Sequence, residues 1–133
     1  MKYLKPWLKP TFLLPALAIL ALFFITRFIN LTRIPVFVDE AIYVRWAQIM
    51  RHEPSLRFLP LSDGKQPLFM WLVIPAFKFF SDPLVAGRAI SAFAGLGTLF
   101  GVSALTYLLT RSRLAILVSA LLYTIVPYTL FFD

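Results

Sequence analysis

Four apolar runs divide the chain, and short polar segments separate them. The runs cover residues 12–29, 67–80, 85–109 and 114–132. A helix that crosses the hydrocarbon core of a bilayer needs about 20 mostly apolar residues. The first and third runs meet this requirement and the fourth nearly does, so the pattern predicts about three transmembrane helices in an all-α protein.

The second run differs from the others because it is short and contains Pro75 and Lys78. Such a segment is typical of an interfacial or re-entrant helix. If it did cross the membrane, Arg111 and Arg113 would fall on the outer side, against the positive-inside rule. We therefore expect residues 67–80 to stay at the membrane surface.

Charges at the ends of the runs predict the orientation of the chain. Three lysines precede the first run, and two arginines lie between the third and fourth. The positive-inside rule then places the N-terminus in the cytoplasm and residues 30–84 in an external loop. The six basic residues of that loop oppose this placement by count, so either they have a function outside or the topology differs. Arg27, inside the first run, is expected to snorkel toward water.

Composition supports a membrane protein and excludes other classes. Hydrophobic residues make up 60% of the chain, charged residues 14%, and the mean hydropathy is +0.82. The net charge of +7 is spread thinly, so membrane lipid is a better partner than nucleic acid. The absence of cysteine excludes disulfides and thiolate metal sites. A signal peptide is disfavoured because no small-residue cleavage site follows the first run.

An adjacent acid pair, Asp39 and Glu40, opens the predicted external loop. From Asp39 to about Arg51 the pattern is helical, with Ile42, Trp46 and Ile49 on one face. This predicts an amphipathic helix that lies flat on the membrane. Asp39 would be its N-cap, and the helix dipole would favour Glu40. A capping carboxylate can also face a substrate, so Asp39 is also a candidate general base.

Cations that could hold a phosphate follow later in the chain. Lys65 lies in "SDGKQPLFMW", and Arg88 stands at the start of the third run. Either can bind a phosphate, and for each the alternative is a side chain that snorkels to the lipid headgroups. His52, the only histidine, has no ligand cluster beside it and is interpreted as a surface residue. We therefore assign no metal ligands from the sequence.

The order of these motifs resembles the N-terminal part of the GT-C fold glycosyltransferases. "VDEAIYVRWAQ", "GKQPLFMWLVIPAFKFFSDP" and "AGRAISAFAGLGTLFGVSALTYLLTRSR" carry the likeness, which is greatest to the protein O-mannosyltransferases and the lipid A aminoarabinose transferases. The resemblance covers nearly the whole chain but only about the first quarter of a typical member.

The resemblance implies a multi-pass enzyme of the plasma (inner) membrane. It would transfer a sugar from a polyprenyl-phosphate carrier to a protein, lipid or glycan acceptor on the outer face. Asp39 would be the catalytic base with Glu40 completing the pair, and Lys65 would meet the donor phosphate. Here "KQP" stands where relatives often have "KPP". The lipid-phosphate sugar would be a substrate, and a divalent metal requirement stays open.

Relatives carry a further acidic motif just beyond the position of Phe132. We therefore expect residues 1–133 to be the N-terminal part of a larger transmembrane domain, inactive by itself. The alternative is a non-enzymatic membrane protein or transporter fragment in which the acid pair only caps a helix. Transporters more often place ionisable groups near the middle of the membrane, and the predicted spans hold few.

Overall fold

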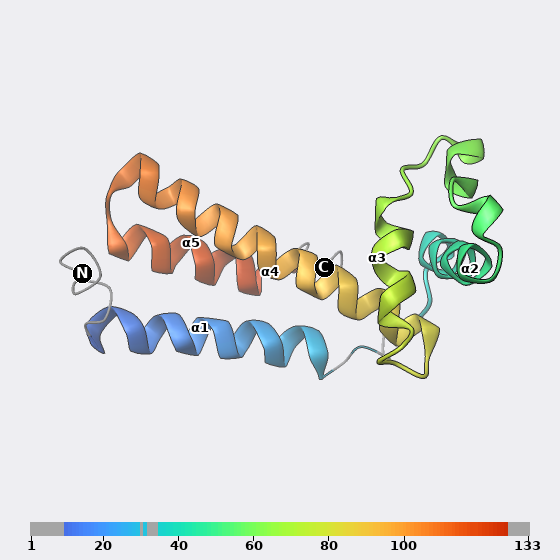
Figure 1. Ribbon diagram of the computed structural model, residues 1–133. Helices are drawn as coiled ribbons and strands as arrows, with labels where there is room; N and C mark the ends of the chain where they lie inside the picture. The colour runs from blue at the N-terminus through green and yellow to red at the C-terminus, as the bar shows by residue number, and fades with distance from the viewer. Residues whose placement is uncertain (1–9, 30, 32–34, 128–133) are drawn as a thin grey trace. The chain divides into compact units, whose positions relative to one another are not determined.

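The computed structural model describes residues 10–29, 31 and 35–127, and within these residues the chain forms only helices and connecting segments (Figure 1). The α-helices are α1 (Pro10–Phe28), α2 (Val38–His52), α3 (Leu68–Ala76), α4 (Pro83–Thr110) and α5 (Arg113–Ile125), and two 3₁₀ helices are η1 (Pro54–Leu56) and η2 (Leu59–Asp63). The all-α prediction is confirmed. The chain divides into a bundle unit, residues 1–29 with 93–133, and a loop unit, residues 30–92.

In the bundle unit, α1, the later part of α4 and α5 lie side by side, and α4 runs opposite to the other two (Figure 1). Ile19, Phe23, Leu99 and Ala120 form its buried core. At 1.5 Å per residue, α1 is about 28 Å long and α4 about 42 Å long. Both are long and apolar enough to cross a membrane, close to the predicted ranges of 12–29 and 85–109.

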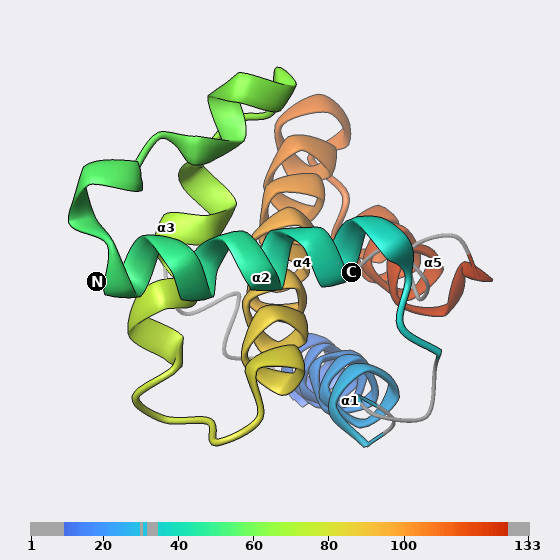
Figure 2. The same cartoon turned by 90° about the vertical axis from the view of Figure 1, so that its right-hand side faces the viewer.

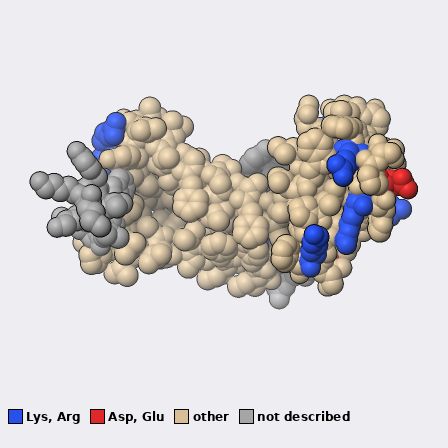
Figure 3. Space-filling view, in the orientation of Figure 1, with Lys and Arg blue, Asp and Glu red and all other residues tan. Residues whose placement is uncertain are grey.

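Most of the apolar surface of the bundle unit is not covered by protein. Leu14, Phe100, Leu109 and Leu114 are among many large side chains that stay exposed. On the face drawn in Figure 3, a basic side chain is visible on the bundle unit only at the end where α4 leads into α5, and the rest of its described surface shows no charged side chain. A monomer in water rarely exposes so continuous an apolar surface, whereas lipid tails accept it.

The helix predicted over residues 114–132 is interrupted near its end. Helix α5 ends at Ile125 after 13 residues, about 20 Å. The cause is Pro127, which disfavours helical geometry in the residue before it. Val126 accordingly has an extended backbone, with φ −62° and ψ 127°. The rest of the predicted span, residues 128–132, lies outside the described residues.

The expectation that Arg27 snorkels is wrong, because its side chain is buried in the bundle unit. Its Nη1 donates a hydrogen bond to the Thr124 carbonyl oxygen at 3.2 Å, and its guanidinium lies 4.1 Å from the centre of the Phe23 ring. Carbonyls in the last turn of a helix point beyond its end and attract cations. The end of α5 thus offers Arg27 a partner inside the protein.

In the loop unit, α2 crosses α3, as Figure 2 shows. The residues buried between them are Ala47 and Met50 of α2 with Met70, Val73 and Ala76 of α3. Helix α2 matches the predicted range, but its buried face carries Val44, Ala47 and Met50, while the predicted face of Ile42, Trp46 and Ile49 is only half-buried. The small side chain of Ala47 lets α3 pack close to α2 on this face. The prediction from periodicity used only large apolar residues and therefore chose a different face.

Helix α3 has nine residues and is about 14 Å long, so it is too short to cross a bilayer. The shortness predicted for this segment is present, and its placement at the membrane surface stays a prediction. After it, Asp82 starts α4: its carboxylate accepts a hydrogen bond from the Leu84 N–H at 2.8 Å, and Pro83 occupies the first helical position.

The start of α4 comes very close to α2. A Cβ atom added at Gly87 would lie 2.9 Å from Cγ2 of Val44, and the branched valine side chain has little freedom to move away. Gly87 therefore permits a contact between the two helices that no larger residue allows.

This contact predicts different effects of the same substitution at two glycines of α4. Gly87→Ala should destabilise the loop unit by about 1–3 kcal/mol through overpacking. Gly97→Ala is the matched control, because nothing lies within 4 Å of its added Cβ. Both gain the same helix propensity. Thermal unfolding followed by circular dichroism in detergent measures the difference, and equal melting temperatures for the two variants would contradict it.

Candidate active site

The two residues that the sequence proposes for chemistry, Asp39 and Lys65, meet in the loop unit. Lys65 Nζ lies 3.1 Å from Asp39 Oδ1, and the two side chains are 30% and 53% exposed. The residues are 26 positions apart in the sequence, so the fold and not the local chain brings them together. A carboxylate and an ammonium group are thus paired at the first turn of α2 and remain open to a ligand.

A tight turn places Lys65 at this point. Helix η2 ends at Asp63, and the next residue, Gly64, has φ 68° and so occupies the left-handed region that glycine adopts without steric cost. The turn is closed by hydrogen bonds from the Gly64 N–H to the Leu61 carbonyl and from the Lys65 N–H to the Pro60 carbonyl, at 3.1 Å and 3.0 Å. The backbone of Lys65 is therefore held, and its side chain extends to α2.

Tyr43 lies beside the pair and was not assigned a role from the sequence. Lys65 Nζ is 4.9 Å from the centre of the Tyr43 ring, within the range of a cation–π contact. Tyr43 follows Asp39 by four residues, so both occupy one side of α2. This spacing of four residues is the sequence signal that could have identified Tyr43 as a neighbour of Asp39. The hydrogen bond to Asp39 raises the pKa of Lys65 above its ordinary value, so the ammonium group stays charged at neutral pH.

Glu40 has a different partner from Asp39. Its Oε1 and Oε2 accept hydrogen bonds from Arg88 Nε at 2.6 Å and Nη2 at 2.8 Å, a bidentate pair. Arg88 also donates from Nη1 to the Leu31 carbonyl and from Nη2 to the Pro35 carbonyl, the latter at 3.5 Å. The Arg88 side chain is only 12% exposed. It is therefore held by the protein and does not extend to solvent as a snorkelling side chain would.

The expected N-cap role of Asp39 is wrong. Helix α2 begins at Val38 and its N-cap is Phe37, whose side chain cannot accept a hydrogen bond. Glu40, the third residue of the helix, instead bonds the N-cap residue: its Oε2 accepts a hydrogen bond from the Phe37 N–H at 3.4 Å. Asp39 lies in the first turn, where its charge still favours the helix dipole. Its carboxylate is bound to Lys65 and is not needed to close the helix.

No three histidine or acidic side chains gather in the part of the chain that the structure describes. His52 lies at the last position of α2 and is exposed, so it does not join Asp39 and Glu40 at the first turn.

The fold and the site together define a class: an all-helical protein with apolar helices of membrane-spanning length and an exposed acid–lysine pair in the loop between them. The sequence matches the family described as dolichyl-phosphate-mannose-protein mannosyltransferase over residues 59–130, more than half of the chain. The chain belongs to this family of glycosyltransferases. The match contains Lys65 and Arg88 and begins after Asp39 and Glu40. No curated protein and no solved structure matches the chain.

The Asp39 contact predicts a change in the titration of Lys65. A lysine whose pKa is raised in the folded state gains stability from its partner at pH values below the ordinary lysine pKa, and this gain is lost as the pH rises through the raised value. In Asp39→Asn the charge of the partner is removed, so the midpoint of Lys65 should fall. Nuclear magnetic resonance of ¹³C-labelled lysine measures it, with Asp63→Asn as control. An unchanged midpoint in Asp39→Asn would show that the two side chains do not pair in solution.

Proposed function

We propose that the protein transfers a glycosyl group from a polyprenyl-phosphate-linked sugar to an acceptor at the outer face of the membrane, with Asp39 as the general base. The observation that carries this proposal is the 3.1 Å contact between Lys65 and Asp39. Membership of the mannosyltransferase family supports the donor class. The acceptor is a protein, a lipid or a glycan that presents a hydroxyl or amino group.

The reaction needs a base for the acceptor proton and, close to it, a cation for the phosphate leaving group. The acceptor oxygen or nitrogen attacks C1 of the sugar, its proton passes to the Asp39 carboxylate, and the bond between C1 and the phosphate oxygen breaks. The electron pair stays on the phosphate, which leaves as polyprenyl phosphate. Lys65 stabilises the charge that develops on this leaving group. When the donor phosphate binds, it competes with Asp39 for the ammonium group and frees the carboxylate as a base.

Glu40 and Arg88 have a supporting role in this proposal. Their bidentate contact joins the first turn of α2 to the first turns of α4 and fixes the residue next to Asp39. A base displaced by about 1 Å can lose about 100-fold in rate. Most of the Arg88 donors are already bound to Glu40 and to backbone carbonyls. We therefore propose direct phosphate binding for Lys65, while Arg88 positions the acid pair and approaches the phosphate only at its remaining N–H.

We predict that Asp39→Asn lowers sugar transfer by about 100-fold to 10,000-fold, the usual loss for a positioned general base. Because Asp39 does not cap α2, membrane abundance should stay near normal. Asp63→Asn makes the same chemical change in the same loop, at a carboxylate that forms no described ion pair with Lys65, and should keep its activity. The measurement is transfer from a polyprenyl-phosphate mannose donor in membranes that contain the protein. Near-normal transfer by Asp39→Asn at normal abundance would refute the catalytic assignment.

The proposed orientation predicts which positions a membrane-impermeant thiol reagent reaches. The chain has no cysteine, so single substitutions give clean labelling. Ser62→Cys, in the exposed helix η2, should react with reagent added outside intact cells. Thr110→Cys, at the end of α4, should react only after the reagent enters the cytoplasm. Ser62→Cys labelled only from the cytoplasm would reverse the orientation.

A further inference from the structure

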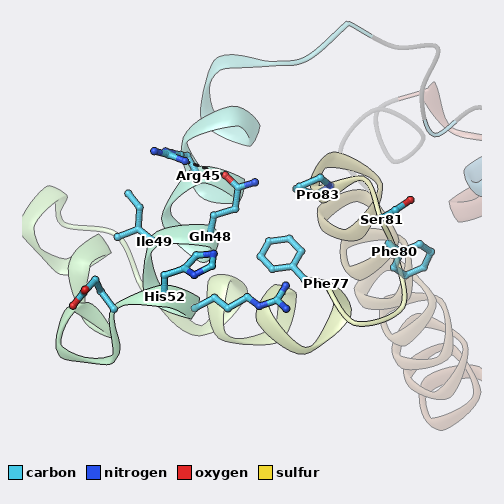
Figure 4. Close-up of a pocket in the computed structure, with 10 residues that line it drawn as sticks. Arg45, Gln48, Ile49, His52, Phe77, Phe80, Ser81 and Pro83 are labelled. Atoms are coloured by element: carbon cyan, nitrogen blue, oxygen red, sulfur yellow. Dashed lines mark hydrogen bonds between the residues drawn. The ribbon is translucent and has the colours of Figure 1, made fainter.

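A cavity of about 450 Å³ lies in the loop unit, away from Asp39 (Figure 4). Gln48 and His52 project from α2 toward the ring of Phe77, and Arg45 lies at the rim. The lining also includes Arg51, Glu53 and Phe80. The volume falls in the range of small-ligand sites.

The cavity lies along the second half of α2, whereas Asp39 lies in its first turn. Arg45, Gln48 and His52 are three and four residues apart, so they share one side of the helix. Arg51 continues the row of Asp39, Tyr43 and Ala47 at intervals of four, but it lies 12 residues beyond Asp39, about 18 Å along the helix axis. A ligand in the cavity therefore does not contact the proposed base, and this inference is independent of the catalytic assignment.

The cavity presents donors that the described part of the protein leaves unused. Neither Arg45 nor Arg51 has a described carboxylate within ion-pair distance, in contrast to Arg88 and Lys65. The Gln48 Oε1 atom accepts from Arg45 at 3.4 Å, which leaves the amide N–H groups of Gln48 without an acceptor among the described residues. The guanidinium of Arg51 makes only a cation–π contact there, 5.9 Å from the Phe77 ring centre. Fork-shaped guanidinium donors match the oxygens of a phosphate.

The other lining residues indicate which kind of phosphate fits. Phe77 and Phe80 follow directly after the apolar helix α3 and give the cavity an aromatic wall. The Glu53 carboxylate, which accepts from the Ser55 hydroxyl at 3.4 Å, adds one negative charge at the edge and can accept from a ligand hydroxyl. A free phosphate ion would use only the arginines and Gln48. A headgroup with a phosphate, hydroxyl groups and attached carbon chains would use the aromatic wall and Glu53 as well.

We propose that this cavity binds the phosphate headgroup of an anionic, hydroxyl-bearing membrane lipid such as phosphatidylglycerol. The phosphate contacts Arg51 and the Gln48 amide, Arg45 contributes charge at the rim, and the first carbons of the lipid pack on Phe77. The bound lipid would hold the end of α2 and the α3–α4 connection at the membrane surface.

The test is lipid retention by the purified 133-residue chain in detergent, followed by native mass spectrometry. The probe is dioctanoyl-phosphatidylglycerol, compared with zwitterionic dioctanoyl-phosphatidylcholine. Arg51→Gln should weaken phosphatidylglycerol binding by about tenfold, because a charge-assisted contact is lost. Gln48→Ala should weaken it by about fivefold without a change of charge. Arg57→Gln, an exposed arginine that does not line the cavity, removes the same charge and should change binding by less than about twofold.

The outcomes separate a lipid site from two alternatives. Equal losses in Arg51→Gln and Arg57→Gln, or equal retention of the two lipids, would overturn the proposal in favour of unspecific attraction. Displacement of the lipid by excess inorganic phosphate would assign the arginines to free phosphate and overturn the lipid. Circular dichroism of each variant tests folding, and a loss confined to Arg51→Gln and Gln48→Ala with unchanged helix content supports the headgroup site.

Discussion

The bidentate pair of Glu40 and Arg88 is the contact on which the loop unit depends. It joins residues 48 positions apart, and Arg88 also ties the carbonyls of Leu31 and Pro35 to the same point. Hydrogen bonds to charged groups contribute about 1.5–3 kcal/mol each, more than most single contacts in a small unit. Two neighbouring features serve the same junction. Gly87 lets α4 approach Val44, and the Asp82 cap starts α4 at the correct residue.

The pair explains how two adjacent carboxylates acquire different surroundings. Asp39 and Glu40 are neighbours on α2, so their side chains point about 100° apart around the helix axis. Glu40 turns toward the start of α4 and is largely enclosed with Arg88. Asp39 turns toward η2 and stays more than half exposed beside Lys65. Enclosure and a guanidinium partner suit a structural acid, whereas exposure next to a single ammonium group suits one that must exchange a proton with a substrate.

In the bundle unit, hydrogen bonds from polar side chains connect apolar helices. Many of its described outward side chains are large and apolar, and two of its buried or half-buried polar side chains find partners on other helices. Arg27 bonds the Thr124 carbonyl, and Tyr123 donates its hydroxyl to the Gly95 carbonyl at 3.1 Å. A buried arginine in a span is costly unless its donors are used. The partners of Arg27 and Tyr123 belong to other helices of the bundle unit, so these hydrogen bonds join α1 to α5 and α5 to α4. Lipid tails cannot supply such partners, because they have no hydrogen-bonding groups.

The sequence by itself determined the helical class, the approximate bounds of α1, α2 and α4, and the shortness of α3, because run length and helical periodicity are local properties. It also pointed to Asp39, Glu40, Lys65 and Arg88 as the residues of interest. It did not decide their pairing. Asp39 was expected to cap α2, and Arg88 to reach a phosphate or snorkel, because capping and snorkelling are judged from neighbours along the chain. Only the tertiary structure set Lys65 against Asp39 and Arg88 against Glu40. Those contacts depend on a left-handed turn at Gly64 and a close approach at Gly87, and on the direction in which each helix leaves its turn.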